Sequence, residues 1–213
     1  MTVVGIVPAG GYGERLGADR PKAFVALAGR PLLEWSLDVL GKVCDRIVVA
    51  VPPGYAEPPD RVEGGDSRSA SVRNALLAAP EADVAVVHDA ARPLLTEELV
   101  ERCLQAVGPG IDGAIAAARM SDTVKEAGPD GRVLRTLDRR SLWRIQTPQV
   151  FRAEILREAL SRNEAVLASA TDDASLVEEL GGVIHVIEAP ADNLKVTRDA
   201  DLRIAETLLR ERV

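Results

Sequence analysis

Short apolar runs recur along this chain, and segments with helical spacing of apolar residues separate them. The runs cover residues 3–7, 46–51, 84–87 and 113–117. The second run is apolar on both faces, as expected of a strand that is covered on both sides of a sheet. Strands that alternate with helices form mostly parallel sheets through right-handed crossovers. The pattern therefore predicts an α/β fold, Rossmann-like, with a mostly parallel twisted sheet flanked by helices.

Helices are expected where apolar residues recur every three or four positions and a capping residue precedes them. A late strand is expected over residues 183–187. The expected helices are 32–40, one capped by Asp66, one capped by Thr96, 152–162, one opened by residues 171–173, and a last one capped by Thr197 or Asp199.

A polar stretch over residues 121–142 interrupts the alternation. Residues 123–126 and 132–137 flank the turn Gly-Pro-Asp-Gly at 128–131, which favours a β-hairpin. The hairpin is too polar for a central core, so we expect an arm that projects from the sheet. An isolated hairpin is marginal in water. A second subunit is its simplest partner, although packing back on its own chain fits the pattern equally well. We expect one domain over residues 1–213, with residues 121–142 as a dimerisation arm.

Composition excludes several classes of protein. The net charge is −7 and no basic stripe is present, so binding to nucleic acid is not expected. Cys44 and Cys103 stand far apart, which is neither a disulfide framework nor a zinc pattern, and both are expected to be buried apolar residues. No apolar run has the length of a membrane span, and no signal peptide is recognised. A cytoplasmic location and no membrane partner are expected.

A glycine-rich loop follows the first strand. Glycines let backbone N–H groups approach a ligand closely and form an anion nest, to which Arg15 and Lys22 add charge. Gly11, Gly13 and Gly17 give a spacing one residue longer than the dinucleotide fingerprint. No P-loop motif is present. A polyphosphate site is favoured over a pair of solvated surface cations.

Asp89 comes directly after the apolar run 84–87, at the edge of an open α/β sheet where ligands bind. It is a candidate Mg²⁺ ligand, because Mg²⁺ favours one or two carboxylates plus substrate phosphate oxygens. A helix-capping aspartate is the equally weighted alternative. His88 and His185 are interpreted as structural residues.

Eight short motifs occur in the order of one known family. The ordered set resembles the 2-C-methyl-D-erythritol 4-phosphate cytidylyltransferases of the non-mevalonate isoprenoid pathway, from about residue 3 to residue 210. The motifs are PAGGxGxR with PK at 8–22, GGDxRxxSV at 64–72, HDAARP at 88–93, DT at 122–123, DR at 138–139, TPQ at 147–149, TDDAS at 171–175 and ADNLKVT at 191–197.

The resemblance implies a nucleotidyltransferase fold and a role for each matching residue. It implies Mg²⁺ or another divalent cation, and a homodimer whose arm brings Thr123 and Arg139 to the partner's site. Two residues depart from the family, with Gly10 where Ala is frequent and Asp173 where Glu is frequent. The implied catalytic residues are Arg15, Lys22, Arg139 and Lys195; the nucleotide-binding residues are Ala9, Gly10, Gly11, Gly13, Gly65, Asp66, Ser71, Asp89 and Ala90; the acceptor-binding residues are Asp89, Arg92, Thr123, Arg139, Thr171 and Lys195; and the metal ligand is Asp89.

The implied reaction transfers the cytidylyl group from CTP to a polyol phosphate, 2-C-methyl-D-erythritol 4-phosphate. The nucleophile is a phosphate monoester, whose second pKa is about 6, so it is ionised without a general base. That fits a chain with two histidines and no catalytic dyad. Two alternatives remain open from the residues: a sibling enzyme that uses ribitol 5-phosphate, and a non-catalytic nucleotide-binding regulator.

Overall fold

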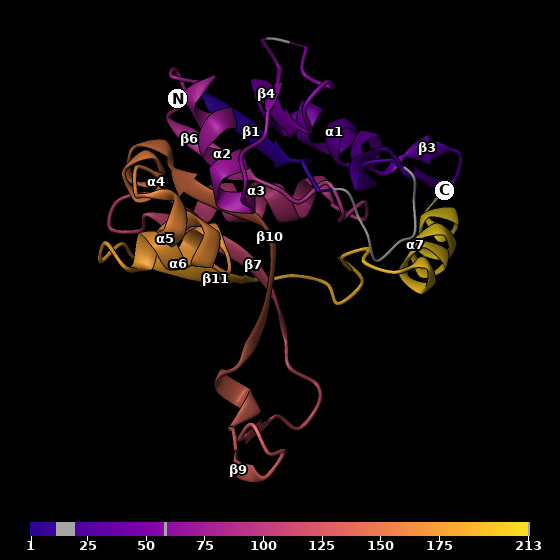
Figure 1. Ribbon diagram of the computed structural model, residues 1–213, viewed down its shortest axis with the longest axis vertical. Helices are drawn as coiled ribbons and strands as arrows, with labels where there is room; N and C mark the ends of the chain where they lie inside the picture. The colour runs from indigo at the N-terminus through magenta and orange to yellow at the C-terminus, as the bar shows by residue number, and fades with distance from the viewer. Residues whose placement is uncertain (12–19, 58, 213) are drawn as a thin grey trace.

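The computed structural model describes residues 1–11, 20–57 and 59–212 and contains a seven-stranded sheet in the order β11-β7-β10-β6-β1-β4-β5 (Figure 1). All pairs in it are parallel except those of β10, which runs antiparallel to β6 and β7. The expected mostly parallel α/β sheet is therefore confirmed. The strands are β1 (Val3–Pro8), β4 (Arg46–Val51), β5 (Arg61–Glu63), β6 (Val84–Val87), β7 (Gly113–Arg119), β10 (Trp143–Arg152) and β11 (Ile184–Glu188).

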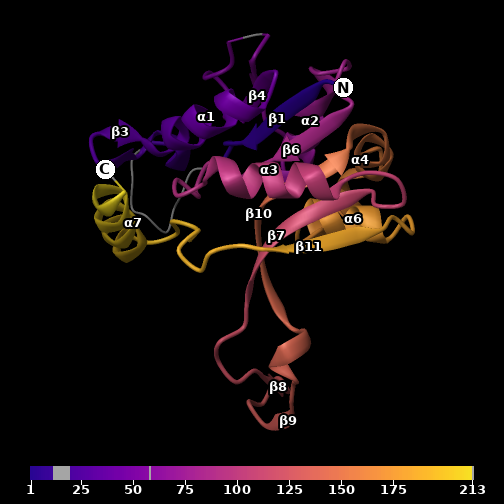
Figure 2. The same cartoon turned by 180° about the vertical axis from the view of Figure 1, so that it is seen from behind.

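Helices cover both faces of the sheet, as Figures 1 and 2 show from opposite sides. One face carries α2 (Arg68–Leu77), α4 (Ala153–Leu160), α5 (Glu164–Ser169) and α6 (Asp173–Glu178), and the other carries α1 (Leu32–Val43) and α3 (Glu97–Ala106). Alternate residues of β1 enter the two cores: Val4 and Ile6 join the first, and Val7 joins the second. This alternation explains why the central strands are apolar without a break.

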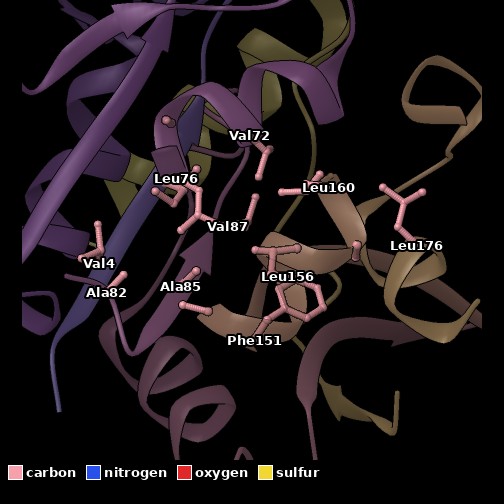
Figure 3. Packing of buried hydrophobic residues seen from close by; sticks show 14 of the residues in the cluster. Val4, Val72, Leu76, Ala82, Ala85, Val87, Phe151, Leu156, Leu160 and Leu176 are labelled. Carbon is pink, nitrogen blue, oxygen red and sulfur yellow. The ribbon is translucent and has the colours of Figure 1, made fainter. Parts of the chain in front are cut away.

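The first core joins the sheet to its helices (Figure 3). Phe151 of β10 is fully buried there beside Leu156 and Leu160 of α4. Leu76 of α2 packs from the neighbouring helix. Aromatic residues are only 3% of the chain, so branched aliphatic side chains fill most of this volume. The result is a rigid platform beneath the carboxyl ends of β1, β4 and β6.

Strand β10 is the main element that the sequence pattern did not reveal. It holds a central position in the sheet, yet it contains Gln146, Thr147, Pro148 and Gln149, which lack the apolar pattern of the other central strands. A proline normally argues against a central strand because it cannot donate to the ladder. Here the register with β7 shifts between Ile145 and Gln149, so the proline lies in the irregular part.

Two helix caps differ from the expectation. The N-cap of α2 is Ser67, whose side chain accepts from the amide of Ala70, and Asp66 lies one residue outside. The last helix, α7 (Asp199–Glu211), has Arg198 as its N-cap, so neither Thr197 nor Asp199 holds that place. The sequence offers more than one possible N-cap at the start of each of these helices. The path of the preceding chain decides which residue begins the helix.

The arm leaves the sheet between β7 and β10 and projects far from it (Figures 1 and 2). It contains the short antiparallel pair β8 (Lys125–Ala127) and β9 (Val133–Thr136), followed by the 3-10 turn η3 (Arg139–Ser141). Every residue of β8 and β9 is exposed. The expected projecting hairpin is therefore confirmed.

The remaining elements lie near the ends of the sheet. The 3-10 turn η2 (Lys22–Phe24) and the short strands β2 (Ala26–Leu27) and β3 (Arg30–Pro31) lead into α1. Leu27 packs in a third core with Val196, Ala205 and Leu209, which fixes α7. Within the described part of the chain, no helix is both long and apolar enough to cross a membrane.

Candidate active site

Two adjoining clefts open at the carboxyl ends of the parallel strands. The large cleft has a volume of about 310 Å³ and the small cleft about 200 Å³. Arg68, Asp89 and Lys195 line both, so these three side chains form the wall between the clefts. The large cleft is also lined by residues 8–11, Lys22, Ala23, 65–67, Ser71, Ala90 and Ala91; the small cleft is also lined by Arg92, residues 145–147, Gln149, Thr171 and Asp172.

Asp89 lies at the centre of this wall and is 7% exposed. Its Oδ1 accepts from Nε of Arg68 at 2.9 Å, and its Oδ2 lies 2.8 Å from Nζ of Lys195. Burial raises the pKa of this carboxyl, but the charges of Arg68 and Lys195 outweigh burial and hold the pKa well below its ordinary value. Asp89 is therefore a buried carboxylate that stays ionised.

Arg68 connects Asp89 to a second buried carboxylate. Its Nη1 donates to Oδ2 of Asp173 at 2.6 Å, and the Asp173 side chain is completely buried. Burial raises the pKa of Asp173, and the Arg68 charge opposes this. Because two carboxylates share Arg68, the guanidinium is fixed at the entrance of α2 between the clefts.

A steric constraint explains Gly65, the second glycine of the pair before α2. A Cβ on Gly65 would lie 2.5 Å from the Cβ of Ala70, so a larger residue does not fit. The Gly65 amide donates to Oγ of Ser71 at 3.1 Å, and this hydroxyl also donates to the carbonyl of Ser67. Asp66, exposed, lines the large cleft beside them. The turn thus presents a compact polar surface to the cleft.

Lys22 lies at the opposite side of the large cleft from α2. It begins the turn η2, and its amide donates to the carbonyl of Gly11 at 3.0 Å. Phe24 of the same turn stacks on Tyr55, with ring centroids 4.9 Å apart. The turn therefore ties Lys22 to the end of the glycine-rich segment. Arg15 and Gly13, two predicted site residues, lie outside the residues that the structure describes.

His88 lies beneath the wall and is completely buried. Its Nε2 lies 3.1 Å from the carbonyl of Arg92, and its Nδ1 lies 3.1 Å from Oγ1 of Thr147. Thr147 Oγ1 accepts from the amide of Asp89 at 3.0 Å. A neutral imidazole protonated on Nε2 satisfies both contacts, and burial lowers the pKa of His88 to about 4. His88 is a structural residue, as the sequence indicated.

Two residues that line the small cleft, Arg92 and Gln149, each have a buried side-chain atom, Nε and Oε1, without a hydrogen-bond partner in the described part of the chain. Nε of Arg92 lies 4.0 Å from Oδ2 of Asp89. Arg92 is 8% exposed, and its Nη1 donates to the carbonyl of Asn193 at 2.7 Å. Gln149 donates to Oδ2 of Asp172 at 2.9 Å. Three cations, Arg68, Arg92 and Lys195, line the small cleft, so it is suited to a polar, anionic ligand.

The structure brings most of the predicted site residues together. The described members of the nucleotide-binding set from Ala9 to Ala90 line the large cleft, and Arg92 and Thr171 line the small one. Thr123 and Arg139 do not join them, because both lie exposed on the arm. Arg139 donates to the carbonyl of Ser121 within the arm.

Four residues of this region received no role from the sequence: Arg68, Gln149, Asp173 and Asn193. Each stands inside one of the short motifs, so the motifs were the available signal. Their contacts with one another and with Asp89, Asp172 or Arg92 span up to 105 positions of the sequence, and local patterns do not encode such pairings.

Candidate metal ligands are sparse. Among the described residues, no group of three or more His, Cys, Asp or Glu is placed to hold a metal ion. Asp89 is the carboxylate in the wall of both clefts. A single carboxylate suits Mg²⁺ only when substrate phosphate oxygens supply further ligands. The donor set therefore fits a metal that arrives with a polyphosphate.

The doubly covered parallel sheet and the cation-lined clefts at its carboxyl edge define an α/β nucleotidyltransferase fold. The family model for 2-C-methyl-D-erythritol 4-phosphate cytidylyltransferase (IspD) matches residues 3–211. The chain belongs to this family.

Individual relatives agree with the family match. The cytidylyltransferase of that name from Frankia casuarinae is 44% identical over 97% of this chain and 81% of its own length. The one from Nocardia farcinica is 42% identical over 99% and 95%. The crystal structure of the Thermus thermophilus protein superposes with a TM-score of 0.81 at 36% identity, covering 99% of this chain and all of that one.

The reaction follows from membership of the family. The chain transfers the cytidylyl group of CTP to 2-C-methyl-D-erythritol 4-phosphate and releases 4-diphosphocytidyl-2-C-methyl-D-erythritol and pyrophosphate. It is a transferase of isoprenoid precursor synthesis. An enzyme with this acceptor is thus favoured over the ribitol 5-phosphate enzyme and over the regulator.

Proposed function

We propose that the large cleft holds CTP and that the small cleft holds the phosphate of 2-C-methyl-D-erythritol 4-phosphate. The observation that carries this assignment is the shared wall of Arg68, Asp89 and Lys195. Two anions must meet for the reaction to occur. A wall with two cations facing both clefts is where their charge is best neutralised.

In the large cleft, Gly65, Asp66 and Ser71 hold cytosine and ribose. The compact turn that they form supports this role, because a side chain at Gly65 would collide with α2. The triphosphate lies between the amides of Gly10 and Gly11 and the ammonium of Lys22. Ala90 also lines this cleft, and Arg15 shares the catalytic role of Lys22.

In the small cleft, Lys195, Arg92 and Thr171 hold the acceptor phosphate. Arg92 supports this assignment, because it lines the small cleft together with Lys195 and a guanidinium can donate to phosphate oxygens. Thr123 and Arg139 come from the arm of a second subunit. The arm projects far from the sheet (Figures 1 and 2), and neither Thr123 nor Arg139 is among the described residues that line the clefts, which supports a role for both in the partner's site.

The chemistry requires positioning more than proton transfer. An oxygen of the acceptor phosphate forms a bond to the α-phosphorus of CTP, and the bond from that phosphorus to the β-bridging oxygen breaks. Pyrophosphate leaves with the electron pair, and no proton needs to be removed from the nucleophile. Arg15 and Lys22 stabilise the charge that develops on the α-phosphate and on pyrophosphate.

Asp89 is the residue that would hold a divalent cation, Mg²⁺ or another of its kind. The ion would supply charge neutralisation at the triphosphate. Lys195 and Arg68 occupy both oxygens of Asp89 in the chain alone. Lys195 also lines the small cleft, where its ammonium would face the acceptor phosphate. A reducing, cytoplasmic location is proposed from the free thiols of Cys44 and Cys103.

The test is pyrophosphate release from CTP with 2-C-methyl-D-erythritol 4-phosphate, run beside ATP, GTP and UTP. We expect release with CTP and little with the other nucleotides. Ribitol 5-phosphate in place of the methylerythritol acceptor tests the small cleft. Equal rates with both acceptors would overturn the assignment of that cleft, and no release from CTP with either would overturn the proposed catalytic roles.

A further inference from the structure

The chain between β11 and α7 carries Lys195 and forms neither helix nor strand. Both ribbon views show it crossing beside the base of the arm (Figures 1 and 2). A segment of this kind has no ladder of backbone hydrogen bonds to fix it. The position of Lys195 therefore depends on the individual contacts on either side of it.

Contacts on both sides of Lys195 hold the segment against the body of the protein. After Lys195, the amide of Val196 donates to the carbonyl of Ala91 at 2.8 Å. Before it, the side chain of Asn193 enters the body of the protein and is 1% exposed. Its Nδ2 donates to Oε1 of Gln146 at 2.8 Å and to the carbonyl of Thr147 at 2.9 Å. One amide thus joins the Lys195 segment to β10.

Asn193 also touches the acceptor side of the site. Its carbonyl accepts from Nη1 of Arg92 at 2.7 Å. Gln146, 3% exposed, lines the small cleft where β10 leaves the sheet to become the arm. Asn193 is therefore the point where strand β10, Arg92 and the Lys195 segment meet.

We propose that Asn193, through its contact with Gln146 and Thr147, is a positioning residue that holds Lys195 against Asp89. The inference rests on the proposed function in one respect, the role of Lys195 at the acceptor phosphate. Loss of the amide leaves two buried acceptors without donors, and the segment shifts to satisfy them with water. Lys195 then leaves its place in the wall, and acceptor use suffers most, because the other residues that line the large cleft stay in place.

The kinetic test is the substitution Asn193→Ala. We expect the KM for 2-C-methyl-D-erythritol 4-phosphate to rise about tenfold to a hundredfold, as for the loss of two buried hydrogen bonds. The KM for CTP is expected to stay within about twofold. A general loss of structure would instead raise the KM for both substrates. Equal effects on both substrates would contradict the proposal.

Dependence on Lys195 is tested in a Lys195→Ala background. A residue that acts through Lys195 should add little to the loss that Lys195→Ala already causes. We expect the double variant to match Lys195→Ala within about twofold in kcat/KM for the acceptor. If the loss of kcat/KM in the double variant equalled the product of the two single losses, Asn193 would act independently of Lys195.

The position of Lys195 is also measured without turnover. Acetylation of its amine by acetic anhydride, followed by mass spectrometry, should be several times faster in Asn193→Ala than in the original chain, because the ion pair to Asp89 shields Nζ. An unchanged rate overturns the inference. A faster rate with unchanged acceptor kinetics supports the positioning and overturns the proposed role of Lys195, so the two failures are distinguishable.

Matched variants separate position from stability. Asn193→Asp keeps the shape and removes the donors, so we expect it to behave like Asn193→Ala. Asn163→Ala removes another side-chain amide, the N-cap of α5, and should leave the kinetics and the acetylation of Lys195 unchanged. If circular dichroism shows that the Asn193 variants do not fold, Gln146→Ala removes one of the two hydrogen bonds from the other side and should also make acetylation of Lys195 faster, by a smaller factor.

Discussion

Asp89 in the cleft wall and Arg139 on the arm are both charged residues with a proposed part in one reaction, yet their surroundings differ. Asp89 is 7% exposed and has a cation on each carboxylate oxygen. Arg139 is exposed, and it donates to a carbonyl of its own arm. The cleft fixes its charged groups with contacts inside one chain, whereas the arm presents them to the surroundings.

The apolar residues show the same contrast. The strands β1 and β6 beneath the clefts are almost entirely buried, whereas Val133 and Leu134 of the arm are 54% and 62% exposed. Apolar side chains exposed together on a two-stranded ribbon favour association, because such a ribbon is marginal by itself. Contacts inside this chain organise the cleft, whereas the arm leaves its apolar side chains exposed.

The largest expected effect lies in the cleft. Lys22→Ala should lower kcat by about 10²–10³, as for removal of one preorganised group that stabilises developing charge. The measurement is pyrophosphate release under saturating CTP and acceptor. The matched control is Lys42→Ala. It removes an exposed lysine of α1 that pairs with Glu97 of α3, and it should leave kcat unchanged. Full activity of Lys22→Ala would remove Lys22 from the proposed mechanism.

Acid should weaken the core beneath the cleft. Burial lowers the pKa of His88 to about 4, so between pH 6.5 and 4 the unfolded chain binds a proton that the folded chain does not. The contribution of neutral His88 to the free energy of unfolding is complete above this window and is lost as the pH falls through it. The difference between the two pKa values sets this loss at about 3 kcal/mol.

Urea unfolding at several pH values measures that loss. The profile of His88→Asn should be flatter over the window than that of the original chain. The matched control is His185→Asn, which changes an exposed residue of β11 and should leave the pH profile of stability unchanged. A parallel shift of the whole His88→Asn curve, with no change in slope, would assign the acid sensitivity to other groups.

On the arm, Arg139→Ala should raise the KM for the acceptor by about ten- to a hundredfold, as for a lost hydrogen bond to a charged group. The KM for CTP should not change. Arg140→Ala is the matched control, because Arg140 lies in the same turn and pairs with Asp138. If Arg140→Ala raised the acceptor KM as much, the effect would belong to the shape of the arm and not to Arg139.

The smallest effect on the folded chain is expected from Leu134→Asp. Charge at this exposed apolar position should abolish the dimer in sedimentation equilibrium and lower acceptor use, while far-ultraviolet circular dichroism stays unchanged. Leu77→Asp, at a position 68% exposed on α2, should leave the dimer intact. A Leu134→Asp protein that remained dimeric would place the interface away from β9.

The alternation of strands and helices was readable because the central parallel strands lie between two layers and are apolar almost throughout. Residues 46–51 and 84–87 show this directly. β10 was not readable, since a strand containing Gln146, Pro148 and Gln149 contradicts local rules and is held centrally by its neighbours. The cap at Ser67 in place of Asp66 shows the same limit on a smaller scale.

The sequence by itself determined the class of fold, the arm and the set of motifs, because periodicity, turn residues and short motifs are local properties of a chain. Only the tertiary structure decided that Arg68 bridges Asp89 and Asp173, and that Asn193 ties the Lys195 segment to β10. These partners lie 21, 105 and 47 positions apart. A buried charge or amide takes whichever partner the packed elements bring within hydrogen-bond distance, and that choice is made by the fold as a whole.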